Sequence, residues 1–188
     1  MKKIFIVGSL NMDLTIKTPY IPKAGETITG SDFITNCGGK GANQATAAGK
    51  LGGVVHMYGA VGNGAVGRAL INNLSNANVD TKFVKSIDNI STGIAVIIIS
   101  DGNNRIILDK GANGELTTSD ISSFLDNSSE GDIYLTQLEN PIDVVGEGLK
   151  IAKSKGLYTI LNPAPANINI SKYFSMKKKI DFVLSLII

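Results

Sequence analysis

Residues 38–45 read Gly-Gly-Lys-Gly-Ala-Asn-Gln-Ala, and the interpretation of the whole fold starts from this stretch. The alanine-rich segment Gly41–Leu51 follows the first glycines and ends at Gly52-Gly53, which predicts a helix that begins at a glycine turn. Glycines before a helix expose backbone N–H groups at the positive end of the helix dipole, where anions and hydroxyl oxygens bind. Lys40 adds a cation and Asn43 adds an amide, so the stretch predicts a polar ligand site. The alternative is a tight strand-to-helix turn that carries a surface lysine.

Apolar runs and helical segments alternate along the rest of the chain. Short continuous apolar runs are typical of strands that are buried on both faces of a parallel sheet. The predicted strands are Ile4–Val7, Val54–Val61, Phe83–Lys85, Ile133–Leu138, Tyr158–Leu161 and Phe182–Ile188. The predicted helices are Val66–Leu74, Ser119–Leu125 with Thr118 or Ser119 as its cap, Pro141–Ser154 and a short one at Ser171–Phe174. This alternation predicts an α/β fold with a mostly parallel sheet.

Two hairpin-like pairs of segments interrupt the alternation. The pairs cover about residues 14–34 and 93–110, and the second one flanks the turn sequence Asp101-Gly102-Asn103-Asn104. Their predicted strands are Leu14–Thr18, Thr27–Ile34, Gly93–Ser100 and Arg105–Lys110. We expect them to form a small separate sheet, or lid, attached to the main layer within a single domain over residues 1–188.

Composition excludes several classes of protein. The chain has 188 residues, 43% hydrophobic and 18% charged, which is typical of a globular domain and excludes disorder. A net charge of +2 is too small to indicate a nucleic-acid partner. Single copies of cysteine (Cys37) and histidine (His56) exclude an internal disulfide and a Cys/His zinc site. The apolar runs are too short for a signal peptide or a membrane span, so we expect a soluble cytoplasmic protein.

Polar side chains follow two other predicted strands. Asn11 and Asp13 come after the first strand, where ligands of open α/β sheets bind, and together they suit a polyol. The alternative for these two residues is an Asx turn that leaves the strand. Glu139 follows another buried strand, and it either faces the same crevice or caps the helix opened by Pro141. The sequence alone favours the capping role.

A second glycine-rich stretch favours a different function. Gly62–Gly67 is a literal G-x-G-x-x-G between a predicted strand and a predicted helix, and Asp80 follows eighteen residues after Gly62. These features match much of the dinucleotide-binding fingerprint. The fingerprint usually comes at the start of its sheet, however, whereas here two predicted strands and the glycine-lysine turn precede it. A dinucleotide-binding domain is therefore the lesser alternative, and no P-loop motif occurs in the sequence.

The chain resembles the ribokinase-type (PfkB) sugar kinases from Ile4 to about Asp181. Gly38–Gly62 matches the first signature of that family, and Gly8–Asp13 resembles its first strand and sugar-binding turn. Further matching segments are Pro22–Thr27, Ser91–Gly93, Lys110–Asn113, Gln137–Glu139 and Asn162–Ala166. The resemblance implies a three-layer α/β/α fold with a β-sheet lid.

The resemblance also implies an activity: transfer of phosphate from ATP to D-ribose, giving ribose 5-phosphate. It assigns substrate binding to Asn11, Met12, Asp13, Gly39, Lys40, Gly41, Ala42, Asn43 and Glu139. The cofactors expected for the full-length family are ATP and Mg²⁺, with a monovalent cation as a further candidate. In this family the lid covers the sugar and often pairs two subunits, so a homodimer is expected.

The end of the chain departs from the family pattern. The general base of the family is an Asp in a Gly-Ala-Gly-Asp turn, and an Asn-Glu-x-x-Glu stretch serves magnesium and phosphate. Neither motif occurs in these 188 residues, and Phe182–Ile188 stands where the second is expected. We therefore expect the C-terminal part of the fold to be absent, with no catalytic or metal-binding residue and no kinase turnover in this chain alone. The alternative of a different class is a non-catalytic sugar-binding or dimerising module.

Overall fold

The main body is built around a six-stranded parallel sheet. The computed structural model describes residues 1–171 and 180–184. The strand order is β10-β9-β8-β1-β4-β5, and every pair of neighbours runs parallel. Its strands are β1 (Lys3–Val7), β4 (Val54–Gly62), β5 (Val79–Ile87), β8 (Ile133–Gln137), β9 (Tyr158–Asn162) and β10 (Phe182–Val183). The predicted parallel α/β sheet is confirmed.

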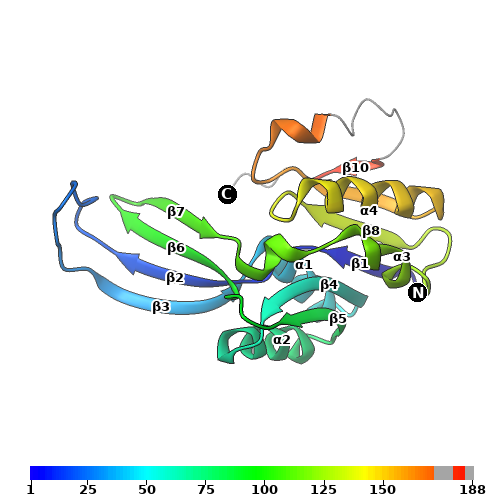
Figure 1. Ribbon diagram of the computed structural model, residues 1–188, viewed down its shortest axis with the longest axis horizontal. Helices are drawn as coiled ribbons and strands as arrows, with labels where there is room; N and C mark the ends of the chain where they lie inside the picture. The colour runs from blue at the N-terminus through cyan, green and yellow to red at the C-terminus, as the bar shows by residue number, and fades with distance from the viewer. Residues whose placement is uncertain (172–179, 185–188) are drawn as a thin grey trace.

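Helices cover both faces of this sheet and give three layers (Figure 1). The helices are α1 (Lys40–Lys50), α2 (Ala65–Asn76), α3 (Ile121–Phe124) and α4 (Ile142–Ser154). Side chains alternate across a strand, so Phe5 of β1 packs with residues of α3 and α4, whereas its neighbour Ile6 packs with residues of α1 and α2. Two hydrophobic cores therefore lie on opposite faces of one sheet.

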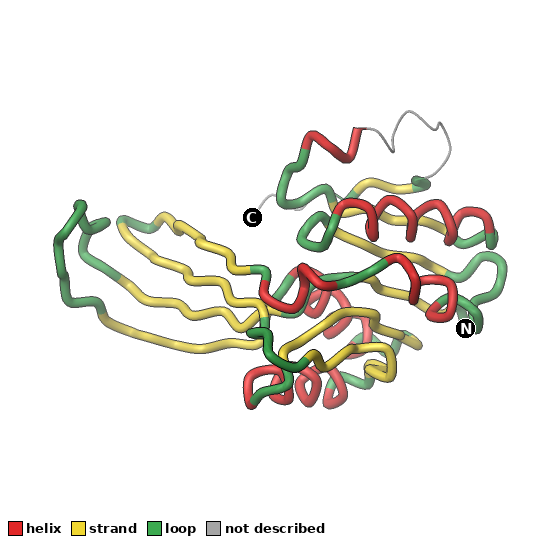
Figure 2. Tube along the Cα trace, viewed as in Figure 1, coloured by secondary structure: helices red, strands yellow, loops and turns green. Residues whose placement is uncertain are grey.

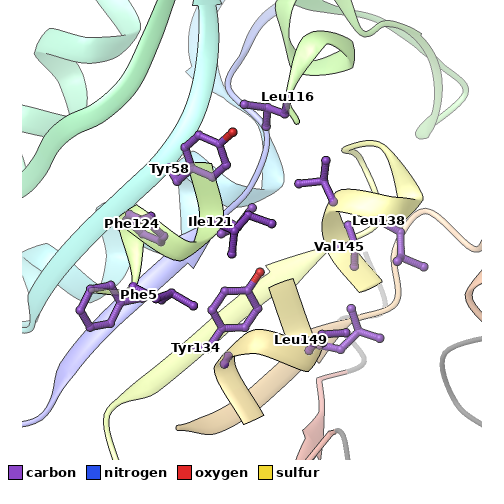
Figure 3. Packing of buried hydrophobic residues seen from close by; sticks show 14 of the residues in the cluster. Phe5, Tyr58, Leu116, Ile121, Phe124, Tyr134, Leu138, Val145 and Leu149 are labelled. Carbon is purple, nitrogen blue, oxygen red and sulfur yellow. The ribbon is translucent and has the colours of Figure 1, made fainter. Parts of the chain in front are cut away.

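Aromatic side chains lie at the centre of the core that contains Phe5 (Figure 3). The ring of Phe124 lies edge-on to those of Phe5 and Phe83, with ring centroids 5.4 Å apart in both pairs. Tyr58 packs on the same ring, and its hydroxyl donates a hydrogen bond to the backbone oxygen of Thr117 at 3.0 Å. Because the rings of Phe5, Tyr58 and Phe124 are almost fully buried and the Tyr58 hydroxyl is paired, this core contributes strongly to stability.

The second sheet forms the lid and projects away from the layered body (Figure 2). Its strands are β2 (Asn11–Lys17), β3 (Ser31–Gly38), β6 (Gly93–Ser100) and β7 (Asn103–Asp109), in the order β3-β2-β6-β7. The outer pairs are antiparallel and the central pair β2–β6 is parallel. Its distal part carries no helix on either face (Figure 2), so side chains on both faces meet solvent.

Several predicted boundaries were wrong. The strand predicted at Thr27–Ile34 is β3, Ser31–Gly38, and the one predicted at Phe83–Lys85 is the longer β5. Both are edge strands, and solvent-facing polar residues extend them beyond the apolar run that the sequence displays. The strand at Leu14–Thr18 likewise begins earlier, at Asn11, because β2 pairs there with both of its neighbours.

The helix predicted at Ser119–Leu125 is shorter than expected. It consists of a 3-10 turn at Thr118–Asp120 followed by α3, and neither helical segment has a side-chain hydrogen bond at its N-cap. The predicted capping by Thr118 or Ser119 is therefore wrong. Of the predicted segments near the end, Ser171–Phe174 and Phe182–Ile188 lie partly outside the described residues. Within the described ranges, no helix is long and apolar enough to cross a membrane.

Candidate functional site

A cavity of about 420 Å³ opens where the root of the lid meets the carboxyl ends of the main strands. Ligands of open α/β sheets bind at this edge. The cavity is lined by Asn11, Asp13, Gly39, Lys40, Asn43, Ala95, Ile97, Ile106, Leu108, Glu139 and Pro165. Residues from the three polar stretches predicted above, 8–13, 38–45 and 137–140, therefore line the same cavity.

Most of the predicted substrate-binding residues line this cavity, but Met12, Gly41 and Ala42 do not. Met12 packs against the core on the face of β2 opposite to its two neighbours, because side chains alternate along a strand. Ala42 is 4% exposed and belongs to the same core. Asn11 and Asp13 lie on strand β2 itself, which excludes the Asx turn that was their alternative.

Glycines bring the start of α1 against the end of β1. A Cβ atom on Gly41 would lie 2.5 Å from the Cα of Gly8, so neither position accepts a larger residue without a backbone shift. Gly39 has φ of 93°, and a Cβ there would lie 2.7 Å from the backbone oxygen of Ser9. The glycine turn is therefore required by close backbone approach, and it directs the N-terminus of α1 toward the cavity.

Glu139 joins the end of β8 to the start of α1. Its Oε2 accepts hydrogen bonds from the Ser9 hydroxyl and, at 3.2 Å, from the backbone N–H of Lys40. Its Oε1 lies 3.8 Å from Nζ of Lys40. Helix α1 has no side-chain cap and no acid in its first turn, so Glu139 supplies the negative charge that the helix dipole favours. The predicted capping of α4 is wrong, since Pro141 at the start of α4 receives no side-chain cap.

Asp13 is held in a partly buried, negatively charged setting. It lies on β2 between Asn36 of β3 and Ala95 of β6. Burial raises the pKa of its carboxyl, and repulsion from Glu139 adds to the effect while Lys40 opposes it. Two carboxylates and one ammonium group thus share the cavity, an arrangement in which a polyol's hydroxyl groups have both acceptors and donors.

The lid supplies an apolar wall to the cavity. The resemblance implied that the lid covers the sugar, but none of these apolar residues was predicted to belong to the site. Ala95 and Ile97 of β6 and Ile106 and Leu108 of β7 line the cavity, and the register places Ala95 and Leu108 in the same row of the lid sheet as Asp13. The signal was present in the sequence, because alternate residues of a strand share one face. Which face of the lid would meet the cavity depended on how the root of the lid packs against the ends of the main strands.

The second glycine stretch lies apart from this site. Gly62–Gly67 connects β4 to α2 and borders a separate cavity of about 520 Å³. Asp80, the acid of the proposed fingerprint, lies at the amino end of β5 and accepts a hydrogen bond from Nδ1 of His56 at 2.9 Å. The amino end of a parallel strand is at the opposite edge of the sheet from the glycine loop, so this carboxylate cannot reach a nucleotide bound there. The dinucleotide-binding alternative is therefore not supported.

Known proteins share this architecture. The chain is 41% identical to the ribokinase of Bacillus subtilis over 166 residues, which cover 88% of this chain and 57% of that protein. The structure of ribokinase from Cryptococcus neoformans in complex with ADP superposes with a TM-score of 0.84 at 32% identity, covering 97% of this chain and 58% of that one. The Arabidopsis thaliana ribokinase complexed with ribose and ATP gives a TM-score of 0.75 at 33% identity, covering 86% and 53%.

Together, the three-layer body, the lid and the cavity at their junction define a ribokinase-like α/β fold. The sequence profile of the pfkB family carbohydrate kinases matches residues 1–184. The chain belongs to this family. It spans a little over half the length of the curated relatives that it matches.

Proposed function

We propose that the chain is the sugar-binding and lid portion of an ATP-dependent sugar kinase of the ribokinase type, which converts D-ribose and ATP to D-ribose 5-phosphate and ADP. The observation that carries this proposal is the convergence of Asp13, Lys40, Asn43 and Glu139 on one cavity that apolar lid residues also line. A sugar has polar edges and apolar C–H faces, and this cavity offers a partner to each. The proposal places the protein in the cytoplasm, where its phosphate donor is found.

Each polar group has a role in this proposal. The carboxylate of Asp13 accepts hydrogen bonds from sugar hydroxyls, and the amide of Asn43 donates one and accepts another. Glu139 completes the pocket and also fixes the start of α1, where Lys40 offsets part of the negative charge of the two carboxylates. The apolar lid wall excludes water from the sugar, which protects a phosphoryl donor from hydrolysis.

We assign no residue of this chain to the phosphoryl-transfer step itself. Transfer needs a base near the accepting hydroxyl and stabilisation of charge on the transferred phosphate. The sequence contains no Gly-Ala-Gly-Asp turn, and the described residues hold no cluster of three acidic, histidine or cysteine side chains that would suit a metal ion. ATP, Mg²⁺ and a monovalent cation therefore belong to the proposal for the full-length family member only.

Two measurements test the proposal. Isothermal titration of the 188-residue chain with D-ribose should show saturable binding that is lost in Asp13→Ala. A coupled assay of ADP release should show no ribose-dependent turnover above background. Absence of ribose binding would contradict the assigned pocket, and ribose-dependent ADP release would contradict the predicted inactivity of this chain.

We also propose that two copies pair through the lid, which is the second candidate role of this chain. Apolar side chains stand exposed on both edge strands: Phe33 and Ile34 on β3, and Ile106 and Ile107 on β7. Exposed apolar groups on sheet edges favour pairing with another chain. Sedimentation velocity should show a dimer that Ile107→Asp converts to monomer. A chain that sediments as a monomer at all concentrations would contradict the pairing.

A further inference from the structure

Asn113 lies buried beneath the root of the lid. It belongs to the 3-10 turn Gly111–Glu115, which follows β7, and it is 2% exposed. Its side chain reaches back about a hundred residues to the junction of β1 and β2: Oδ1 accepts a hydrogen bond from the backbone N–H of Leu10 at 2.9 Å, and Nδ2 donates to the backbone oxygen of Leu10 at 3.0 Å. The end of the lid is thereby tied to its beginning.

The same amide also holds the side chain of Asn11. Nδ2 of Asn113 donates its second hydrogen bond to Oδ1 of Asn11 at 2.8 Å. Both N–H donors of Asn113 are therefore used, and rotating the amide by 180° would place its oxygen against two other oxygens. A buried amide with three matched partners has one stable orientation.

This orientation determines which atom Asn11 presents to the cavity. Asn11 lines the cavity, and its oxygen is turned toward Asn113, so its Nδ2 is the group left to face a ligand. Among the described residues, none accepts a hydrogen bond from that Nδ2. The neighbouring Asp13 offers only acceptors when it is ionised, so Asn11 adds a fixed donor beside it.

The two amides also lie where the lid strands leave the body. Asn11 is the first residue of β2, and it pairs with Gly38 of β3 and Gly93 of β6. A Cβ atom on Gly93 would lie 2.2 Å from Oδ1 of Asn11 and 2.3 Å from Nδ2 of Asn113. Only glycine leaves room for this amide pair at the root of the lid.

We propose that Asn113 is a positioning residue that directs Nδ2 of Asn11 into the cavity, where it donates a hydrogen bond to one hydroxyl oxygen of the bound sugar. The inference rests on the proposed function of the cavity. Asn113 itself does not line the cavity, and it acts only through Asn11.

The main test measures affinity by calorimetry for D-ribose and for analogues that each lack one hydroxyl group. The hydroxyl contacted by Asn11 is the one whose deletion weakens binding to the unaltered chain but not to Asn11→Ala. We expect Asn113→Ala to weaken ribose binding about threefold to tenfold, the loss typical of one hydrogen bond. In that variant, deleting the same hydroxyl should cost no further affinity.

Two outcomes would overturn the inference. One is unchanged ribose affinity in Asn113→Ala. The other is equal weakening of ribose and every analogue, which would indicate a structural role only. Asn63→Ala is the matched control, since it removes an amide that donates to Asp88 at 2.7 Å on the surface, and it should bind ribose normally.

A second measurement needs neither a folded Asn113 variant nor a ligand. In NMR spectra of the unaltered chain, with each side-chain NH₂ peak assigned through bonds to its own residue, the NH₂ of Asn113 should exchange with water far more slowly than that of Asn11. Equal exchange rates would contradict the fixed amide orientation. If the unaltered chain bound no ribose, the proposed function would fail, and this exchange experiment would still decide the orientation.

Discussion

The six-stranded sheet of the body and the four-stranded sheet of the lid are stabilised in different ways. Strands of the body are covered by helices on both faces, and the residues of β1 at its centre are largely buried. In the lid, most residues of the edge strands β3 and β7 are exposed. Burial of apolar area therefore stabilises the body, whereas strand pairing and contacts at its root hold the lid. The candidate site lies at the border between the two.

The largest expected difference in stability is between two phenylalanine-to-alanine variants, one in the body and one in the lid. Phe124→Ala removes a ring that is 2% exposed in the body, and we expect it to lower the free energy of unfolding by about 3–5 kcal/mol. Phe33→Ala removes a ring that is 60% exposed on the lid and should change it by about 0.5 kcal/mol or less. Urea denaturation at low protein concentration measures both. Equal losses would contradict the division between body and lid.

Asp13, at the root of the lid, should show opposite effects on binding and stability. Asp13→Asn removes a charged acceptor, and we expect ribose affinity to fall by about 1.5–3 kcal/mol, roughly tenfold to a hundredfold. The same change removes a charge that burial and, to a smaller extent, repulsion from Glu139 disfavour, so the free energy of unfolding should rise at neutral pH. Calorimetry and thermal melting test the two effects. A variant that is less stable than the unaltered chain would contradict the electrostatic argument.

The difference in unfolding free energy between Asp13→Asn and the unaltered chain should depend on pH, because the pKa of Asp13 is raised. A carboxyl whose pKa is higher in the folded state carries a stability cost when it is ionised. The cost is complete above the folded-state pKa, and it disappears as pH falls toward the ordinary aspartate value. The stability advantage of Asp13→Asn should therefore vanish in acid, and ribose binding by the unaltered chain should weaken over the same range.

Gly67 tests the close packing within the body. A Cβ atom there would lie 2.1 Å from the backbone oxygen of Gly62, at the contact between α2 and β4. We expect Gly67→Ala to cost about 1–3 kcal/mol, as overpacking usually does. Gly64→Ala is the matched control, because the space around Gly64 is open. A similar loss in both variants would indicate that the glycine stretch has a role other than packing.

Replacing Asp80 is expected to have the smallest effect on stability. The pKa of Asp80 is lowered, whereas that of Asp13 is raised, so the two replacements should change stability in opposite directions. Burial opposes its ionisation, but the backbone N–H of Lys82 and the ring of His56 outweigh that and lower its pKa. A lowered pKa contributes stability above the ordinary aspartate value, and this contribution is lost as pH falls through the folded-state pKa. Asp80→Asn should therefore cost less than about 1 kcal/mol at neutral pH. Ribose affinity should not change, and a loss of binding would contradict the assignment of Asp80 to the opposite sheet edge.

Local patterns in the sequence predicted much of the fold and of the site. Apolar runs predicted the buried strands of the body because both faces of those strands are covered. The edge strands β3 and β5 were misplaced, since solvent-facing residues need not be apolar. Glu139 was correctly associated with a helix start, but the helix was α1 rather than α4.

The sequence by itself determined the parallel α/β body, the glycine turn before α1 and the types of polar residue at the strand ends. Chain order and hydrophobic periodicity are local properties, and they are sufficient for such assignments. Only the tertiary structure decided that Glu139 binds the backbone N–H at the start of α1, that the lid supplies an apolar wall and that Asn113 donates a hydrogen bond to Asn11. These contacts join residues about a hundred positions apart, and their geometry depends on how two sheets pack at a shared edge. Patterns in neighbouring residues do not encode contacts between residues so far apart in the sequence.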